Sequence, residues 1–302
     1  MVELNWRNGC FEPARRAGVN DLIEIGNCSH SLPRPTLHPD PSILGLKMSG
    51  AHANSLENAH SGKFPTPPAF ATKLEEREFL KFRLAQALRM FGNHGFDEGP
   101  AGHITVRDPI LPRVLLDHQG QILDESGQKD GPFRILNMAA FMIHSAIHAA
   151  RPDVICAAHS HSTYGKAFSS LGKMLDPISQ DSCSFYEDHV VYTQFNGIVL
   201  EEAEGLAIAK ALGNKKAAIL QNHGLLVVGS TIESTIRSYI SLERACQVQL
   251  LAEATGTPLK INHAQAKETA KIIGNQRAGW FSGTMEFMVL EREEGVKFHA
   301  SE

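Results

Sequence analysis

The chain has 302 residues, of which 42% are hydrophobic. This is enough for one large domain or two small ones and excludes wholesale disorder. Acidic residues outnumber basic ones by 33 to 29, and a net charge of −4 gives no electrostatic reason to expect nucleic acid or an anionic membrane as partner. No apolar run approaches the roughly 18 residues of a membrane span. With no visible signal peptide and five scattered cysteines, we expect a cytoplasmic protein without a disulfide framework.

The chain divides into three parts. Residues 1–71 have no sustained hydrophobic period and are rich in proline, which removes backbone donors and blocks helices, so they predict a disordered tail. Order begins at Thr72, which stands three residues before Glu75 in the spacing of a capping box. We predict a folded domain over 72–256, followed by a less regular C-terminal arm over 257–302 that packs on it.

Helical and strand patterns alternate within the predicted domain. Apolar spacing predicts helices over about 72–91, 135–147, 163–171 and 201–212, and a last long helix capped by Ser230 and Glu233. β-rich runs predict strands over 114–116, 154–161, 217–220 and 225–228. The alternation indicates a layered α/β fold rather than a helical bundle or a β-sandwich.

Histidine is the unusual component, with 15 residues in the chain. His159 and His161 stand two apart at the end of an apolar strand pattern, so both imidazoles point to the same face. His223 lies in a turn between two predicted strands. Three imidazoles with an open position are typical of catalytic zinc and also suit Fe(II) or manganese. The alternative is that the three are hydrogen-bonded structural histidines.

Other candidates carry a weaker signal. His144 and His148 are four apart on a predicted helix and could share a metal, but the stretch between them lacks the glutamate of the His-Glu-x-x-His motif. Cys156 and Cys183 have no CxxC partner, which is typical of buried, inert thiols.

Five motifs, taken in order, resemble the class II aldolase/adducin family, whose best known enzyme is fuculose-phosphate aldolase. They are Gly102-His103-Ile104-Thr105-Val106-Arg107, residues 117–120, residues 144–153, His159-Ser160-His161, and Gln221-Asn222-His223-Gly224. The resemblance implies a three-layer α/β/α domain with a central, mainly antiparallel sheet. It also implies a small-molecule substrate, zinc held by His159, His161 and His223, and a homotetramer with sites between subunits. Substrate contacts are expected at Gly102, His103 and Asn222.

The chain departs from the family at several positions. Ala140 stands where the aldolases have the glutamate that moves the proton, and alanine cannot do so. Met138 and Ala139 replace serines that help to bind phosphate, and His103 replaces an asparagine. The tyrosine that a neighbouring subunit donates falls near Gln180. These changes favour a substrate without phosphate.

A further departure is the short segment 109–116. The family has another strand and a loop there, so we expect one strand of the sheet to be absent and the domain to be less stable for it.

Three functions remain open. The first is a metal-dependent lyase that cleaves or decarboxylates a small hydroxy or oxo acid, with Tyr186, Asp188 or His189 replacing the lost acid/base. The second is an iron-dependent oxygenase or decarboxylase of aromatic acids in secondary metabolism. The third is a non-catalytic, adducin-like protein of the actin cytoskeleton, but three converging histidines argue against a pure scaffold.

Overall fold

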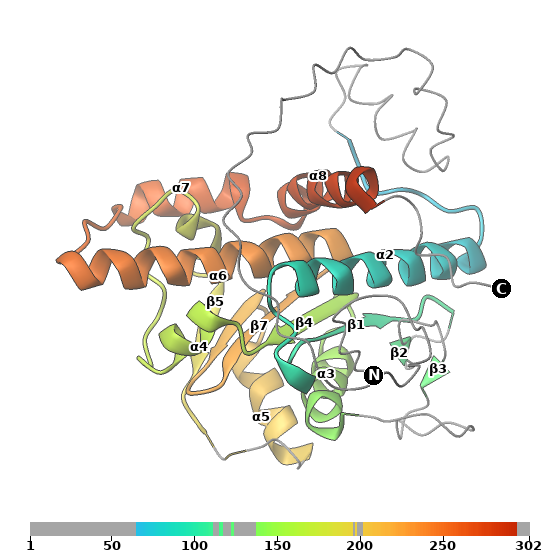
Figure 1. Ribbon diagram of the computed structural model, residues 1–302, viewed down its shortest axis with the longest axis horizontal. Helices are drawn as coiled ribbons and strands as arrows, with labels where there is room; N and C mark the ends of the chain where they lie inside the picture. The colour runs from blue at the N-terminus through green and yellow to red at the C-terminus, as the bar shows by residue number, and fades with distance from the viewer. Residues whose placement is uncertain are drawn as a thin grey trace, which may run out of the picture.

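A seven-stranded sheet forms the centre of the computed structural model, which describes residues 65–110, 115–116, 122–123, 137–195, 197 and 202–294 (Figure 1). The strand order is β3-β2-β1-β4-β7-β6-β5. The strands are β1 (His103–Arg107), β2 (Leu115–Leu116), β3 (Ile122–Leu123), β4 (Cys156–Ser160), β5 (His189–Tyr192), β6 (Ala217–Leu220) and β7 (Gly224–Gly229). Most of the predicted tail, residues 1–64, lies outside the described residues.

The sheet is mainly antiparallel, as predicted. β1 pairs with β4, β4 with β7 and β7 with β6 in antiparallel register, and only the pair β5–β6 is parallel. β4 and β7 are buried along their whole length, which explains the apolar run before His159 and the apolar residues of β7. The centre of the sheet therefore gives the polar residues at its strand ends a rigid support.

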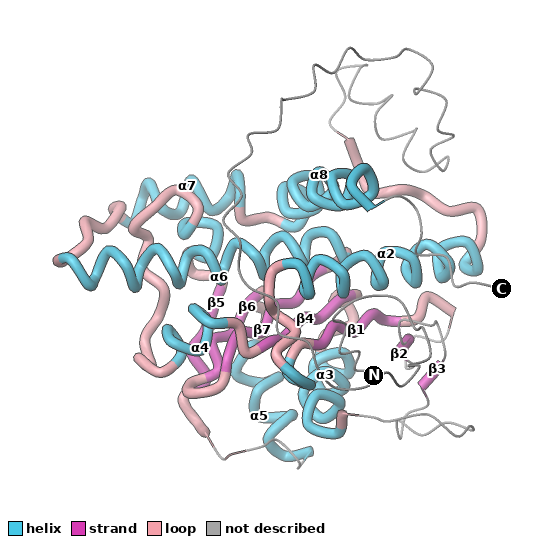
Figure 2. Tube along the Cα trace, in the orientation of Figure 1, coloured by secondary structure: helices cyan, strands magenta, loops and turns pink. Residues whose placement is uncertain are grey.

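Helices cover both faces of the sheet and make a three-layer α/β/α domain (Figures 1 and 2). One face carries α2 (Lys73–Asn93) and α6 (Ile232–Thr255), and the other carries α3 (Met138–Ala150) and α5 (Glu202–Leu212). Each face has its own apolar core, one centred on Tyr239 and Phe91 and the other on Ile147 and Leu212. This arrangement confirms the predicted fold class.

Short helices and one cap complete the domain. The 3-10 helices η2 (Gly99–Ala101) and η3 (Ser182–Phe185) lie in connections, and α4 (Thr163–Ser169) follows β4. The Thr72 side chain accepts a hydrogen bond from the Glu75 amide and begins α2, as predicted. At α6 the expectation was wrong by one residue, because the N-cap is Thr231 rather than Ser230.

The C-terminal arm is more regular than predicted. It forms two helices, α7 (His263–Ile273) and α8 (Gln276–Glu294), and α8 packs along α6. Trp280, Phe287 and Leu290 are the buried large side chains of α8. The arm escaped prediction because apolar and polar residues are mixed around α8, where Met285 and Val289 are exposed, and because α7 is short. The exact domain boundaries remain predictions.

The short segment after β1 still supplies a strand. Val106 and Arg107 of β1 pair with Leu116 and Leu115 of β2, and β2 pairs onward with β3. β2 lies within the strand predicted over 114–116, and the expectation that a further strand of the family is absent stays a prediction. The loops around β2 and β3 lie outside the described residues.

Candidate metal centre

Three histidines converge at one end of the sheet. His159 is the fourth residue of β4, His161 follows that strand directly, and His223 lies in the turn between β6 and β7. Each offers one ring nitrogen, and these three atoms all lie within 4.8 Å of one another. The ring centroids of His161 and His223 are 4.7 Å apart, and those of His159 and His223 are 4.8 Å apart. The structure thus brings together the three ligands predicted from the sequence.

The turn that carries His223 depends on two residues with special backbone requirements. Asn222 has φ 56°, in the left-handed region that asparagine tolerates better than most residues. At Gly224, a Cβ atom would lie 2.4 Å from the Ser160 carbonyl oxygen, so only glycine allows β7 to approach β4 this closely. Asn222 itself is exposed, and its visible role here is to shape the turn.

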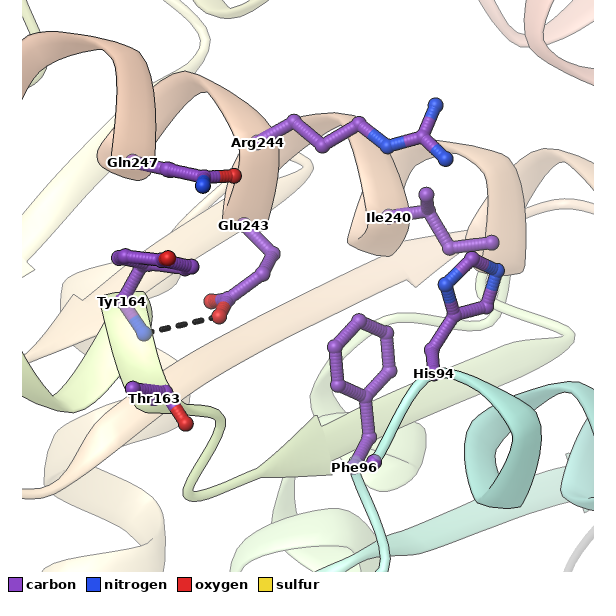
Figure 3. A pocket seen from close by; sticks show the side chains of 9 residues that line it. His94, Phe96, Thr163, Tyr164, Ile240, Glu243, Arg244 and Gln247 are labelled. Atoms are coloured by element: carbon purple, nitrogen blue, oxygen red, sulfur yellow. Dashed lines mark hydrogen bonds between the residues drawn. The ribbon is translucent and has the colours of Figure 1, made fainter. Parts of the chain in front are cut away.

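A buried hydrogen-bond network holds the chain on both sides of His161. The Glu243 carboxylate on α6 accepts hydrogen bonds from the Ser162 hydroxyl at 2.5 Å and from the Tyr164 and Gly165 amides at 2.8 Å. Figure 3 shows this carboxylate pointing at the start of α4, beside a cavity of about 200 Å³. The Tyr239 hydroxyl lies 2.7 Å from the Ser160 hydroxyl. Because α6 anchors Ser160 and Ser162, His161 has little freedom to move away from its two neighbours.

The electrostatic surroundings keep the three rings neutral. Burial lowers the pKa of His159 well below its usual value, and the neighbouring histidines add to the shift. Burial, followed by the charge of His161, lowers the pKa of His223 to about 4. The pKa of His161 is also lowered, first by burial and then by Lys166. Neutral imidazoles at physiological pH have lone pairs for a metal ion.

This donor set fits a divalent metal ion. Three neutral imidazoles are a ligand set typical of catalytic zinc. The Nδ1 atom of His159 is buried without a hydrogen-bond partner. A buried nitrogen without a partner is costly, and a ring that serves as a ligand gains an interaction that offsets this cost.

Two more histidines extend the cluster behind the ligands. His103 on β1 pairs with His159 across the strands, and their ring centroids are 4.9 Å apart. The ring of His144, on α3, lies 4.5 Å from that of His103. Both residues are buried, and each leaves its Nε2 atom without a partner. His103 is thus placed beside the candidate ligands, and its contact with a substrate stays a prediction.

Gly102 and Ala140 flank this cluster. A Cβ atom at Gly102 would lie 2.1 Å from the Phe96 carbonyl oxygen, so glycine is required for the close approach of the chain before β1. Ala140 is buried and lies one helical turn before His144 on the same face of α3. Its methyl group offers no acid or base there.

The residues predicted to replace the acid/base lie elsewhere in the chain. Asp188 and His189 are at the start of the edge strand β5, where His189 pairs with Ala217 at the end of β6 remote from His223. Nε2 of His189 accepts the Leu175 amide, and its Nδ1 donates to the Phe185 carbonyl. Asp188 accepts the Lys216 amide, and the Tyr186 hydroxyl lies 2.9 Å from His263. Within one chain these three do not join the histidine cluster, and a catalytic role for them stays a prediction.

Sequence reasoning missed the anchors Tyr239 and Glu243 and underrated His144. The two anchors are 79 and 81 positions from Ser160 and Ser162, so no local spacing connects them. A signal for Glu243 was available, because an acidic residue among apolar positions of a predicted helix needs a partner when it is buried. His144 was considered only as a metal ligand together with His148.

The chain is similar to known enzymes over most of its length. Residues 82–250 match the model of the class II aldolase and adducin N-terminal domain. Decarboxylase NovR of Streptomyces niveus is 42% identical over 237 residues, which cover 72% of this chain and 86% of that protein. A second relative, from Streptomyces roseochromogenus subsp. oscitans, is also 42% identical over 237 residues, which cover 72% of this chain and 84% of that protein. It is named 4-hydroxy-3-prenylphenylpyruvate oxygenase/4-hydroxy-3-prenylbenzoate synthase.

The solved structures agree with this result. The L-fuculose 1-phosphate aldolase from Glaciozyma antarctica PI12 superposes with a TM-score of 0.68 at 46% identity, covering 78% of this chain and 97% of that one. The comparisons support an enzyme of the lyase type that acts on a small molecule. Among the helices of the described residues, none is both long and apolar enough to cross a membrane.

Proposed function

Because the chain belongs to the class II aldolase and adducin family, we propose that it is a metal-dependent lyase that breaks a carbon–carbon bond in a small hydroxy or oxo acid. The observation that carries this proposal is the convergence of His159, His161 and His223, with ligand atoms within 4.8 Å of one another. These residues would hold the ion, most simply zinc, with Fe(II) or manganese as the other candidates. When bound, such an ion polarises a carbonyl or carboxylate oxygen.

The chain's own residues favour a substrate without a phosphate group. Asn137, Met138, Ala139 and Ala140 form the start of α3, and the last three present hydrocarbon rather than hydroxyl groups. His103 uses its Nδ1 atom to donate to the Ala101 carbonyl, which leaves no N–H for an anion. A phosphate dianion binds through several donors, and the described residues here supply few.

The names of two relatives suggest where to look for the substrate. One is called a decarboxylase, and the other is named for the conversion of an arylpyruvate-type acid. We therefore propose an aryl-substituted oxo or hydroxy acid as the first substrate to test. A cytoplasmic homotetramer is part of the same proposal, because the family resemblance implies sites between subunits.

The proposal is tested by offering substrates to protein loaded separately with zinc, Fe(II) or manganese. We expect the chain to release carbon dioxide or a carbonyl fragment from 4-hydroxy-3-prenylphenylpyruvate or its unprenylated form. L-fuculose 1-phosphate should be cleaved very weakly or not at all. The control is the variant in which His159, His161 and His223 are all changed to alanine, which should turn over no substrate with any of the metals. Strong cleavage of the sugar phosphate, or no turnover with any metal, would contradict the proposal.

An oxygenase is the second candidate, and the name of the Streptomyces roseochromogenus relative favours it. The same assay distinguishes the two, because a lyase works without dioxygen. Turnover that requires Fe(II) and consumes dioxygen in step with product would establish the oxygenase. The non-catalytic, adducin-like alternative is weaker, because a scaffold has no use for buried ring nitrogens that lack hydrogen-bond partners.

A further inference from the structure

A chain of buried hydrogen bonds runs from Val154, two residues before β4, to His144, behind the three candidate ligands. His148 Nδ1 lies 3.3 Å from the Val154 carbonyl oxygen. The Thr105 hydroxyl lies 2.9 Å from His148 Nε2 and 2.8 Å from His144 Nδ1. All of these side chains are buried, and the chain ends at His144 Nε2, which has no partner.

The chemistry of the partners fixes the direction of each hydrogen bond. A carbonyl oxygen only accepts, so His148 Nδ1 carries the proton and donates to Val154. A neutral imidazole has one N–H, so His148 Nε2 accepts, and the Thr105 hydroxyl donates to it. Since the only O–H of Thr105 is donated to His148, the Thr105 oxygen accepts the hydrogen bond from Nδ1–H of His144. The Nε2 atom of His144 is then an unprotonated lone pair.

The neutral form of these rings agrees with their burial. Desolvation lowers the pKa of His148 to about 3 and that of His144 well below its usual value. The neighbouring His103 has the same tautomer, because its Nδ1 donates to the Ala101 carbonyl. Two bare Nε2 atoms therefore belong to adjacent buried rings, and both require a donor that the described residues do not supply.

We propose that His144, through its bare Nε2 atom, accepts a proton from a hydroxyl group of the substrate, and that Thr105 and His148 are positioning residues that hold it in this tautomer. The inference rests on the proposed lyase function and names the proton acceptor for it. The ring of His103 contacts both His144 and His159, so one ring connects His144 with the candidate ligands. His144 therefore selects a substrate that has a hydroxyl group on the carbon next to the bond that breaks.

The step balances without an oxidant. The hydroxyl proton passes to His144 Nε2, and the oxygen lone pair forms a carbonyl as the adjacent carbon–carbon bond breaks. The electron pair of that bond stays on the other fragment as an enolate, which takes up a proton from water. His144 then returns its proton to the solvent, which restores the starting tautomer.

The first experiment reads the tautomer directly by NMR, in protein labelled with ¹⁵N at its histidines, both metal-free and zinc-loaded. Two-bond ¹H–¹⁵N correlations distinguish a protonated from a bare ring nitrogen, and His144→Gln assigns the signal. We expect a protonated Nδ1 and a bare Nε2 in the unchanged chain and in Thr105→Ser. Thr105→Val should lose this preference, because its side chain has the same shape without the hydroxyl. A proton on Nε2 of His144 in the unchanged chain would overturn the inference.

The second experiment measures turnover together with metal content, using an aryl-substituted 4-hydroxy-2-oxo acid, because its 4-hydroxyl group lies on the carbon next to the bond that breaks and its oxo group lets the other fragment leave as an enolate. We expect His144→Gln to lose about 10²–10⁴-fold in turnover with its metal retained. Thr105→Val should lose about 10–100-fold, as outer positioning residues do, and Thr105→Ser should recover most of this. The matched control is Thr284→Val, because Thr284 is a buried threonine of α8 whose hydroxyl donates to the Trp280 carbonyl.

The outcomes separate the two proposals. Full turnover by His144→Gln, or loss of its metal, would overturn the role of His144 alone. If the unchanged, metal-loaded chain turns over none of the substrates, the lyase function fails, and the acceptor role fails with it.

Discussion

Buried histidines in two regions of this protein differ in their hydrogen bonds. At the edge strand β5, His189 has a partner for each of its ring nitrogens. Between β1, β4 and α3, the rings of His103, His144 and His159 each leave one nitrogen without a partner. The first arrangement stabilises the fold, whereas the second costs stability. The difference indicates that the second group is kept for binding and chemistry, and substitutions in each region should behave accordingly.

The largest loss of stability and of metal affinity is expected for Glu243, which anchors the metal centre. Glu243→Ala leaves one hydroxyl and two backbone amides without their buried acceptor, so the free energy of unfolding should fall by about 3 kcal/mol. Metal affinity should weaken about 10–100-fold as His161 loosens. Urea unfolding and zinc titration measure the two effects. Glu286→Ala is the control, because it removes only a surface ion pair with Arg237. A Glu243→Ala protein with unchanged zinc affinity would disprove the anchoring role.

A smaller loss of stability is expected for a substitution in the edge strand β5, and metal binding should not change there. His189→Leu removes the acceptor of the Leu175 amide and the donor to the Phe185 carbonyl, at a cost of about 2 kcal/mol. Bound metal per folded chain should not change. Thermal unfolding and elemental analysis of the same samples make this test. Loss of metal in this variant would show that β5 contributes to the metal centre, and the contrast between the two regions would not hold.

The smallest effect concerns pH and the hydrogen-bond chain behind the site. Burial lowers the pKa of His148 to about 3, so the folded state keeps this ring neutral while the unfolded state binds a proton below about pH 6.5. The unfolded state binds more protons in this range, so stability falls as the pH falls. Between pH 7.5 and 5.5 His148 should contribute a loss of about 1.4 kcal/mol.

Comparing His148→Gln with the unchanged chain at the two pH values isolates this contribution. The variant is expected to be less stable overall but to lose about 1.4 kcal/mol less on acidification. An identical pH dependence of unfolding in both proteins would mean that His148 is already charged in the folded state or remains neutral in the unfolded one.

The contrast also explains how far the sequence alone could lead. Local signals were sufficient for the strand before His159, for the turn at His223 and for the cap at Thr72, because neighbouring residues determine each of them. They did not show where His189 lies in the sheet, because its polar neighbours in the chain carry no information on strand pairing, and its catalytic role stays a prediction. Only the strand register shows that it starts β5 at the end remote from His223.

The hydrogen-bond partners were beyond reach for a related reason. Thr105 lies 39 residues from His144 and 43 from His148, and the three meet only because α3 packs against β1. The helices of the C-terminal arm were missed because they pack on elements distant in the sequence, α8 on α6 and α7 on η3. The partners of Thr105 and the helices of the arm both depend on contacts between distant elements, which local sequence patterns do not reveal.

The central claim is that His159, His161 and His223 hold a metal ion, and elemental analysis of the purified chain tests it most directly. We predict about one equivalent of zinc, iron or manganese per chain, and almost none when all three residues are changed to alanine. The triple variant should be compared with His189→Leu, which keeps the three ligands. An unchanged chain without metal, or a triple variant that binds as much metal as the unchanged chain, would contradict the account.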